Sequence, residues 1–306
     1  MYHCFYAGCN FNGILTDFCK ADRPMFPQYA AGAAGYAPTR SGNRYKTARN
    51  DAQSTLGEVP MLPSDYKPLT AEVMQKIKPL TDSPDCTDPD QLAARRYLLD
   101  QGISLATAIT ARTGCLRHYC ITKDSENKSE QASNVFPCIA YVNYVDGHPV
   151  NAKYRSCSPS PSARQEEGKP TVYSKFWGQD SPTTPCAPYN IDCLNPLLVE
   201  EETIPRVIVV EGEKDTLVLA EAGYRYVISV PSGAASDLGK SFEAFLPWLD
   251  QVDHIVVCGD TDLPGRILTK RLSDYFNARC LFVTLPGGCK DIGDVMLQYG
   301  LSLIQI

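Results

Sequence analysis

The sequence predicts an α/β protein in which a small α+β basic subdomain precedes a mostly parallel four-stranded sheet flanked by helices. Two observations carry this prediction. Strand-like and helix-like segments alternate four times over the last hundred residues, and a hairpin pattern with an Asp-Gly turn lies upstream of them. The chain has 306 residues, 43% of them hydrophobic and 21% charged, which is enough material for about two globular domains.

The last third of the chain accounts for the parallel sheet. Four short β-branched runs, RVIVV, YVISV, HIVVC and CLFVTL, have the length and composition of buried strands. They occupy residues 206–210, 226–230, 254–258 and 280–285. Helical segments follow them near residues 214–222, 238–249, 264–277 and 291–299. Four strand-then-helix units imply parallel strands with helices on both faces.

Two helices are predicted upstream of this sheet. Asp88 is a good N-cap before Pro89, and the run DQLAARRYLLDQ that follows has helical spacing up to a stop at Gly102. Ser104 then caps a second helix, SLATAITART, which Gly114 ends.

From Val135 the hydrophobic period changes to two. VFPCIAYVNYV and HPVNAKYRS lie on either side of Asp146 and Gly147, a dipeptide that favours a hairpin turn, and the strand-like piece TVYSKFW ends at Trp177. Between Gly147 and Gly178 there are 5 Lys and Arg residues against 2 acids, with aromatic residues among them. That mixture suits single-stranded nucleic acid, and the alternative is an exposed sheet face of ordinary composition.

The cysteine content and the hydropathy of the sequence indicate the cellular compartment in which the protein is expected. There are 13 cysteines, an odd count without a Cys-x-x-Cys pair, at a density below that of a small disulfide-stapled scaffold. The amino-terminal text has no basic start of a signal peptide, and no stretch approaches the ~18 apolar residues of a membrane span. We therefore expect a reduced intracellular protein without a membrane partner.

The formal net charge of -6 lies entirely in the last third of the chain. Residues 201–306 hold 9 Lys and Arg against 15 acids, whereas residues 1–200 hold 20 of each. The acidic total therefore does not argue against a nucleic-acid partner for the earlier part, and the acids of the last third need an explanation of their own.

These acids follow the predicted strands. The first strand runs into VEGEKD, the third into GDTDLPGR and the fourth into GGCKDIGD. The acids in these loops are Glu211, Glu213, Asp215, Asp260, Asp262, Asp291 and Asp294. Because the carboxyl ends of parallel strands meet at one edge of a sheet, the acids would converge there and repel one another unless cations lie among them.

Such a set of hard oxygen ligands favours Mg²⁺, or Mn²⁺ in its place. Two such ions can activate an attacking hydroxyl and stabilise a leaving oxygen in phosphoryl or nucleotidyl transfer. The alternative is that the acids only cap the helices that follow the strands, which is a common arrangement.

The motifs EGEKD, D-x-D-x-x-G-R and K-D-x-x-D-V, each after a hydrophobic strand, resemble the TOPRIM domain of bacterial-type primases, type I and II topoisomerases and some nucleases. The resemblance implies that Glu211 is the general acid/base and that Asp260 and Asp262 are catalytic metal ligands. It implies a Mg²⁺-binding edge made of Glu211, Asp215, Asp260, Asp262, Asp291 and Asp294. Arg266 matches the arginine after the glycine and is interpreted as structural.

The upstream text resembles bacteriophage primase-helicases and Twinkle-like proteins, through RRYLLDQGISLATAITARTG and through the hairpin followed by KFWG. This resemblance implies that Lys153, Arg155, Lys175 and Lys290 bind nucleotide or template. It further implies a cytoplasmic protein of a bacterial cell or a phage-infected host.

The amino terminus, YHCFYAGCNFNGILTDF, resembles the second half of a primase zinc ribbon, with Cys4 and Cys9 as candidate Zn²⁺ ligands. A structural zinc site needs four ligands, so the ribbon is incomplete unless the chain is truncated at its start or Cys19 and His3 take part. The resulting parts are a zinc-ribbon remnant, a flexible basic linker, a helical and hairpin subdomain, and the TOPRIM domain, at residues 1–21, 22–66, 67–203 and 204–306.

These observations predict a DNA primase, a nucleotidyltransferase that makes short RNA primers from ribonucleoside triphosphates on single-stranded DNA. A replicative helicase on a separate chain is the expected partner, because no helicase segment occurs in the sequence. The alternatives are a TOPRIM-type nuclease and a non-catalytic fragment that binds single strands or a helicase. A topoisomerase is disfavoured because 306 residues leave little room for a strand-passage domain.

Overall fold

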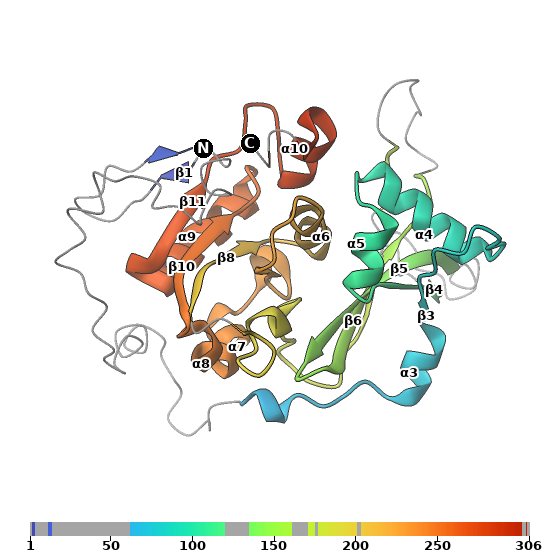
Figure 1. The fold of residues 1–306 in the computed structure, drawn as a ribbon, viewed down its shortest axis with the longest axis horizontal. Coiled ribbons are helices and arrows are strands. Elements are labelled where there is room, and N and C mark those ends of the chain that lie inside the picture. The colour runs from blue at the N-terminus through green and yellow to red at the C-terminus, as the bar shows by residue number, and fades with distance from the viewer. Residues whose placement is uncertain are drawn as a thin grey trace, which may run out of the picture.

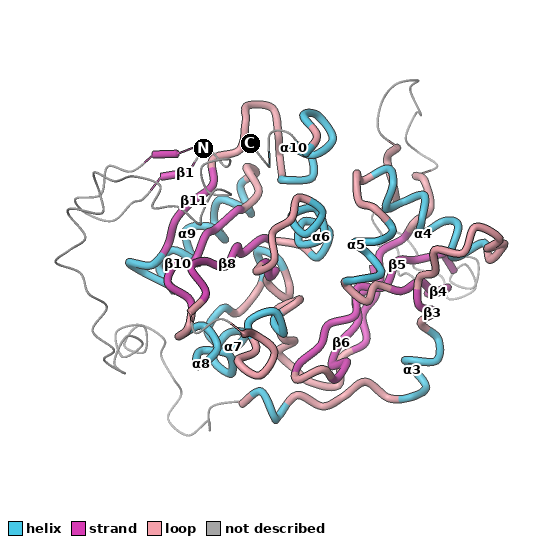
Figure 2. The backbone as a smooth tube through the Cα atoms, viewed as in Figure 1, coloured by secondary structure: helices cyan, strands magenta, loops and turns pink. Residues whose placement is uncertain are grey.

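The protein folds into two lobes that lie side by side (Figure 1). The structure, a computed structural model, describes residues 2–3, 12–13, 62–119, 135–160, 171–174, 177–200, 203–301 and 304. One lobe contains a parallel sheet and the helices that cover it. The other contains an antiparallel sheet and the helices that precede it in the chain (Figure 2).

The predicted parallel sheet is confirmed. Its four parallel strands lie in the order β9 (Val227–Ser229), β8 (Ile204–Val210), β10 (Val252–Cys258) and β11 (Cys280–Val283). β8 comes first along the sequence of these four strands, the next strand, β9, lies on one side of it, and the one after, β10, lies on the other side. The direction of strand addition therefore reverses between β8 and β10, and a crevice is expected where these two strands end.

Helices cover both faces of this sheet. On one face lie α6 (Glu213–Glu221) and α10 (Ile292–Tyr299), and on the other α7 (Leu238–Phe242), α8 (Leu246–Leu249) and α9 (Leu263–Phe276). Along β8, Ile208 packs into the first cluster and Val209 into the second, as expected for alternating side chains. No helix among the described residues combines the length and hydropathy of a membrane span.

The continuous helix predicted over residues 238–249 is wrong. The segment forms α7, a 3-10 turn (Glu243–Phe245) and α8. Pro247 lies in the first turn of α8, where its missing N–H and its ring are tolerated, whereas a continuous helix would place it in the interior.

The sheet continues at its β11 edge in a way that the sequence did not predict. β1 (Tyr2–His3) pairs antiparallel with β11, and β2 (Asn12–Gly13) pairs with β1, which makes six strands in all. These two-residue strands come from the segment that resembles a zinc ribbon. Cys4, Cys9 and Cys19 lie outside the described residues.

The second lobe is built on a five-stranded antiparallel sheet. Its order is β3 (Lys78–Pro79), β4 (Gly114–Tyr119), β5 (Val135–Val145), β6 (His148–Ser156) and β7 (Trp177–Asp180). The predicted hairpin is confirmed as β5 and β6, and its turn residues Asp146 and Gly147 have φ angles of 52° and 74°. Positive φ at both positions matches the right-handed twist of the two strands.

Gly114 is a strand residue and does not end the preceding helix, contrary to the prediction. α5 (Leu105–Thr110) ends earlier, and Arg112 takes the left-handed conformation with a φ of 54°. A Cβ at Gly114 would lie 2.5 Å from Ile77 Cγ2 and 2.9 Å from the Lys78 carbonyl oxygen. The glycine therefore allows the close approach of β3.

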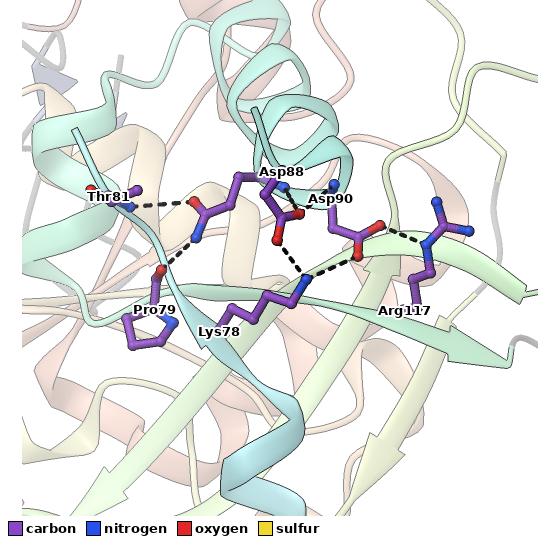
Figure 3. Close-up of polar contacts among 7 residues, drawn as sticks. Lys78, Pro79, Thr81, Asp88, Asp90 and Arg117 are labelled. Carbon is purple, nitrogen blue, oxygen red and sulfur yellow. Dashed lines mark hydrogen bonds and ion pairs between the residues drawn. The ribbon is translucent and has the colours of Figure 1, made fainter. Parts of the chain in front are cut away.

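A polar cluster fixes α4 (Pro89–Asp100) to the antiparallel sheet (Figure 3). Asp88 Oδ1 accepts hydrogen bonds from the backbone N–H groups of Asp90 and Gln91, as an N-cap does. The Lys78 ammonium lies 2.6 Å from Asp88 Oδ2 and 3.4 Å from Asp90 Oδ2, and Arg117 Nε donates to Asp90 Oδ1 at 2.9 Å. The buried carboxylate of Asp90 is thereby paired with two cations.

The two lobes share one hydrophobic cluster. It joins Tyr97 and Leu98 of α4 to Leu217 of α6 and to Val295 of α10. The start of α5 is also held by the parallel-sheet lobe, because the Ser104 N–H and Oγ–H donate to Glu221 Oε2 at 2.9 and 2.7 Å. The position of one sheet relative to the other is thus set by packing and by hydrogen bonds.

Buried Asn143 fixes the connection between the lobes. Its Nδ2 donates to the carbonyl oxygens of Ala187 and Pro188 at 3.1 and 2.9 Å, and its Oδ1 accepts from the N–H groups of Tyr144 and Asn190 at 3.0 Å each. The hairpin register shifts at this point, between Asn143 and Tyr144. One amide therefore holds both the irregular strand and the segment that leads into the parallel sheet.

Candidate active site at the edge of the parallel sheet

The predicted acidic residues gather at the carboxyl ends of β8, β10 and β11. Glu211 follows β8 directly, Asp260 and Asp262 follow β10, and the pair Asp291 and Asp294 begins α10 after β11. Glu211 and Asp260 thus come from the two neighbouring strands between which the order of strand addition reverses. This is the position at which open α/β sheets bind ligands.

Glu211 is partly buried against the loop that follows β9. Its Oε1 would lie 3.0 Å from a Cβ on Gly233, and Gly233 has a φ of 53°, so a side chain at that position would be both strained and crowded. The glycine therefore brings the loop close to the carboxylate that is the candidate general acid/base.

Asp260 and Asp262 converge on one cation. Lys290 Nζ lies 3.0 Å from Asp260 Oδ2 and 3.1 Å from Asp262 Oδ2. Burial raises the pKa of Asp260, although Lys290 opposes that shift, whereas the N–H of Gly265 at the start of α9 lowers the pKa of Asp262. Two carboxylate oxygens are thereby aimed at a single position that carries positive charge.

The D-x-D-x-x-G spacing has a steric reason in this loop. A Cβ on Gly265 would lie 2.5 Å from both the Cβ and the carbonyl oxygen of Asp260. Asp262 is the N-cap of α9, and its Oδ1 accepts from the N–H of Gly265 at 3.0 Å. The glycine lets the first turn of α9 approach Asp260, so that both carboxylates point to the same side.

A second carboxylate pair encloses Lys214. Its ammonium lies 3.1 Å from Asp291 Oδ2 and 3.4 Å from Asp215 Oδ1. Asp215 is only 7% exposed, and burial raises its pKa to about 7, while Lys214 acts in the opposite direction. For Lys214, burial alone would lower the pKa, but Asp215 and Asp291 outweigh that effect and raise it.

Asp291 and Asp294 also serve the local structure. Asp291 Oδ1 accepts from the N–H of Asp294 at 2.8 Å, and Asp294 Oδ2 accepts from the N–H of Lys290 at 2.7 Å. These bonds form the N-terminal cap of α10. The capping role considered from the sequence therefore applies to both residues, whereas Asp260 has no such bond among those described.

The described acids of this site do not form one common cluster of metal ligands. Within the part of the chain that the structure describes, no three His, Cys, Asp or Glu side chains come close enough together to hold a metal ion. The six acids predicted as one Mg²⁺-binding edge instead include two pairs, and each pair has a lysine between its members.

A cavity of about 760 Å³ lies between the two lobes, beside the end of β8. The antiparallel lobe contributes Tyr97, Tyr141, Lys153, Arg155 and Tyr173, and the parallel-sheet lobe contributes Gly212, Glu213, Lys214, Pro231, Ser232 and Ala235. Asp260 and Asp262 are not among the residues that line it. The cavity thus adjoins the acidic edge on the side of α6.

The predicted basic residues have different environments. Lys153 and Arg155 lie two residues apart on the same face of β6 and line the cavity, and Lys153 Nζ lies 2.5 Å from Glu213 Oε1 on the facing lobe. Lys290 lies with the acids on the other side of β8. Lys175 lies outside the described residues. Arg266 is exposed in the first turn of α9, and its interpretation as structural stays a prediction.

Several contributors to this site were missed from the sequence. The tyrosines of α4 and β5, Tyr97 and Tyr141, are 4% and 3% exposed and line the cavity, and in the sequence they look like ordinary core residues. Lys214 was visible between two acids of EGEKD, and that spacing is the signal that could have identified it. Gly233 had no signal, because its role depends on a contact between two loops.

Residues 206–284 match the family model described as Toprim domain. The resemblance to a TOPRIM domain is thus confirmed for this part of the chain. The match covers the strands β8 to β11 and the loops that carry Glu211, Asp260 and Asp262.

Two curated proteins of Arabidopsis thaliana are similar to the chain. A primase homolog protein is 30% identical over 124 residues, covering 34% of this chain and 36% of that protein. A chloroplastic and mitochondrial Twinkle homolog protein is 26% identical over 186 residues, covering 55% of this chain and 23% of that protein. The chain thus spans about a third of one relative and about a quarter of the other. The predicted resemblance to primases and Twinkle-like proteins is confirmed at this level.

The crystal structure of the primase fragment of the bacteriophage T7 primase-helicase is similar to 68% of this chain and to 71% of its own chain. The TM-score is 0.48 and the sequence identity 19%.

Proposed function

We propose that the chain is a DNA primase, which joins ribonucleotides on a single-stranded DNA template by metal-dependent nucleotidyl transfer. The observation that carries the proposal is the arrangement of opposite charges across the lobes. The carboxylates of Glu211, Asp260 and Asp262 follow two neighbouring strands, and the adjoining cavity presents Lys153 and Arg155 from the other lobe. Nucleotidyl transfer needs both, since cations bind the triphosphate while carboxylates serve the reacting oxygens.

Asp260 and Asp262 fit a Mg²⁺ or Mn²⁺ ion. Both carboxylates already converge on one positive charge, and Mg²⁺ is usually held by only one or two carboxylates together with water and substrate phosphates. When bound, the ion would activate the attacking hydroxyl and stabilise the leaving oxygen. Lys290, whose side chain is 54% exposed, would then leave the pair and bind a phosphate oxygen.

The chain's other residues have roles in orientation and proton transfer. Glu211 accepts the proton of the attacking 3′-hydroxyl. Lys153 and Arg155 project from the same face of β6 and bind the triphosphate, after Lys153 exchanges its contact with Glu213 for phosphate. Charge-assisted bonds of this kind hold the nucleotide in a defined orientation.

The remaining predictions from the sequence belong to the same proposal. Lys175 would contact the template beyond the cavity, and Cys4 and Cys9 would contribute to a zinc site. A replicative helicase would be the partner.

Primer synthesis tests the proposal. The full chain is incubated with labelled ribonucleotides, single-stranded DNA of varied sequence and Mg²⁺ or Mn²⁺, and short RNA products are measured. We expect products from the wild-type chain and none from Asp260→Ala. The matched control is Asp253→Ala, because Asp253 is an exposed acid at the opposite end of the same strand. Absence of product on every template, or full activity of Asp260→Ala, would contradict the proposal.

Incubation of the same chains with single-stranded DNA alone separates the alternatives. A TOPRIM-type nuclease would cleave the DNA when no nucleotides are added, and loss of Asp260 would stop the cleavage. A non-catalytic fragment would bind single strands equally well with or without the carboxylate.

A further inference from the structure

The two lysines of the acidic edge differ in how firmly they are held. Lys290 follows a loop with two successive glycines, Gly287 and Gly288, and its side chain is 54% exposed. Lys214 lies in the first turn of α6, and its side chain is 24% exposed. The Lys290 ammonium can move into solvent, whereas the Lys214 side chain is more buried.

The enclosure of Lys214 has a steric component. A Cβ on Gly293 of α10 would lie 2.5 Å from Lys214 Nζ and 3.1 Å from its Cε. The absence of a side chain at Gly293 therefore creates the space that the ammonium fills. The end of the lysine is held between two helices of the same sheet face.

The carboxylates around Lys214 have little left to offer another cation. Asp291 uses one oxygen for the cap of α10 and the other for Lys214. Asp215 Oδ1 is buried and makes no hydrogen bond, and its ion pair with Lys214 at 3.4 Å is the interaction that balances its charge. A divalent ion would need coordinating water as well as carboxylates, and this pair is closed to water on the Asp215 side.

We propose that Lys214 is a built-in substitute for a second metal ion, so that the acidic edge binds one divalent ion, at Asp260 and Asp262, and not two. The inference rests on the proposed function, because it concerns the metal of that reaction. The Lys214 ammonium offsets part of the negative charge of Asp215 and Asp291 without any ligand exchange, and it also lines the cavity, where it would face the phosphate of a bound nucleotide. Four of the six acids predicted as metal ligands are thereby divided between one ion and one lysine.

The count of bound Mn²⁺ tests this inference without reference to activity. The full chain is titrated with Mn²⁺ at pH 8 while electron paramagnetic resonance reports the free ion. We expect one ion per wild-type chain at the acidic edge, identified as the ion that is lost in the double variant Asp260→Ala, Asp262→Ala. We expect two ions in Lys214→Met, because Asp215 and Asp291 then lack their cation.

Lys290→Met is the matched control. It removes the other lysine of the edge, so the count stays at one and Mn²⁺ binds about tenfold more tightly, since the ion no longer displaces an ammonium. Two ions at the edge of the wild-type chain would overturn the proposal even if neither variant folds.

An unchanged count of one in folded Lys214→Met would overturn it as well. Failure of the proposed function gives a different result. A chain that binds one Mn²⁺ and makes no primer on any template would refute the primase and leave the role of Lys214 intact. A chain that makes primers while binding two ions at the edge would refute the role of Lys214 alone.

Discussion

The two sheets present functional side chains in different ways. In the parallel sheet the candidate residues lie beyond the ends of strands, as Glu211 does after β8 and Asp260 after β10. In the antiparallel sheet they lie within a strand, as Lys153 and Arg155 do in β6, on the face turned toward the other lobe. Loops at strand ends can bring several acids to one ion, whereas a strand face spaces its cations two residues apart along an extended substrate.

This difference suggests a division of labour. The strand ends would carry the chemical step and the strand face would carry substrate binding. The largest effects on rate should therefore follow changes at the ends of the parallel strands, and the largest effects on affinity should follow changes on the face of β6.

Asp262→Asn should have the largest effect. It removes a charged ligand from the pair that faces the metal, so the rate at saturating nucleotide should fall about 100-fold or more, with a smaller change in KM. Steady-state primer synthesis measures both constants. The control is Asp274→Asn, an exposed acid farther along the same helix. A change in KM alone would show that the end of β10 serves substrate binding, and it would contradict the assignment of the chemical step to the strand ends.

Arg155→Ala should act mainly on affinity. Loss of a charged hydrogen-bond donor to a phosphate costs about 1.5 to 3 kcal/mol, which corresponds to a KM for ribonucleotides roughly 10- to 100-fold higher, with kcat less affected. Lys270→Ala is the charge-matched control, because Lys270 is an exposed cation on α9. The comparison would fail if Arg155→Ala lowered kcat and left KM unchanged.

Asn143→Ala tests how the strand face is held in position. The change leaves two carbonyl oxygens and two N–H groups of the connection between the lobes without their partner, so the free energy of unfolding should fall by about 2 kcal/mol. Urea denaturation measures the loss. His148→Ala, at an exposed position of the same hairpin, should be nearly neutral. Equal stability of Asn143→Ala and wild type would show that the amide does not hold the hairpin.

The smallest expected effect is a pH dependence from Asp215. Burial raises its pKa to about 7 in the folded chain, so between about pH 4 and pH 7 the folded state keeps a proton that the unfolded state has lost. Stability from this group is therefore present at low pH and is lost as the pH rises through 7, with a slope of up to about 1.4 kcal/mol per pH unit. Asp215→Asn should lack this component.

Urea denaturation in the presence of a chelator, at pH values from 5 to 8, measures this slope. Asp253→Asn, the exposed acid at the start of β10, should keep the wild-type slope. If the free energy of unfolding changes with pH equally in wild type and Asp215→Asn, the Asp215 carboxylate is already ionised at pH 5. Asp215 would then behave as an exposed acid does, contrary to its burial in the structure.

The sequence predicted the parallel sheet and its acids well because both depend on local patterns. An acid in a short loop after a buried strand must lie close to the end of that strand. The D-x-D-x-x-G spacing also fixes Asp260 and Asp262 relative to Gly265, which allows the close approach of α9. The chain direction then brings the strand ends together without further information.

Other features depend on contacts between distant segments and could not be predicted in this way. The pairing of Lys214 with Asp291 joins residues 77 positions apart, and Tyr97 and Tyr141 become cavity residues only when the lobes pack together. The two-residue strands β1 and β2 are too short to have a hydrophobic period. The broken helix at Pro247 could have been anticipated, because a proline disfavours a helix interior.

The hydrophobic cluster shared by the lobes has a consequence for how the cavity works. A hinge between the lobes would have to separate Tyr97 and Leu98 from Leu217, and it would also break the contact between Ser104 and Glu221. Opening would therefore expose apolar surface to water. We therefore expect the cavity to keep its width when substrate binds.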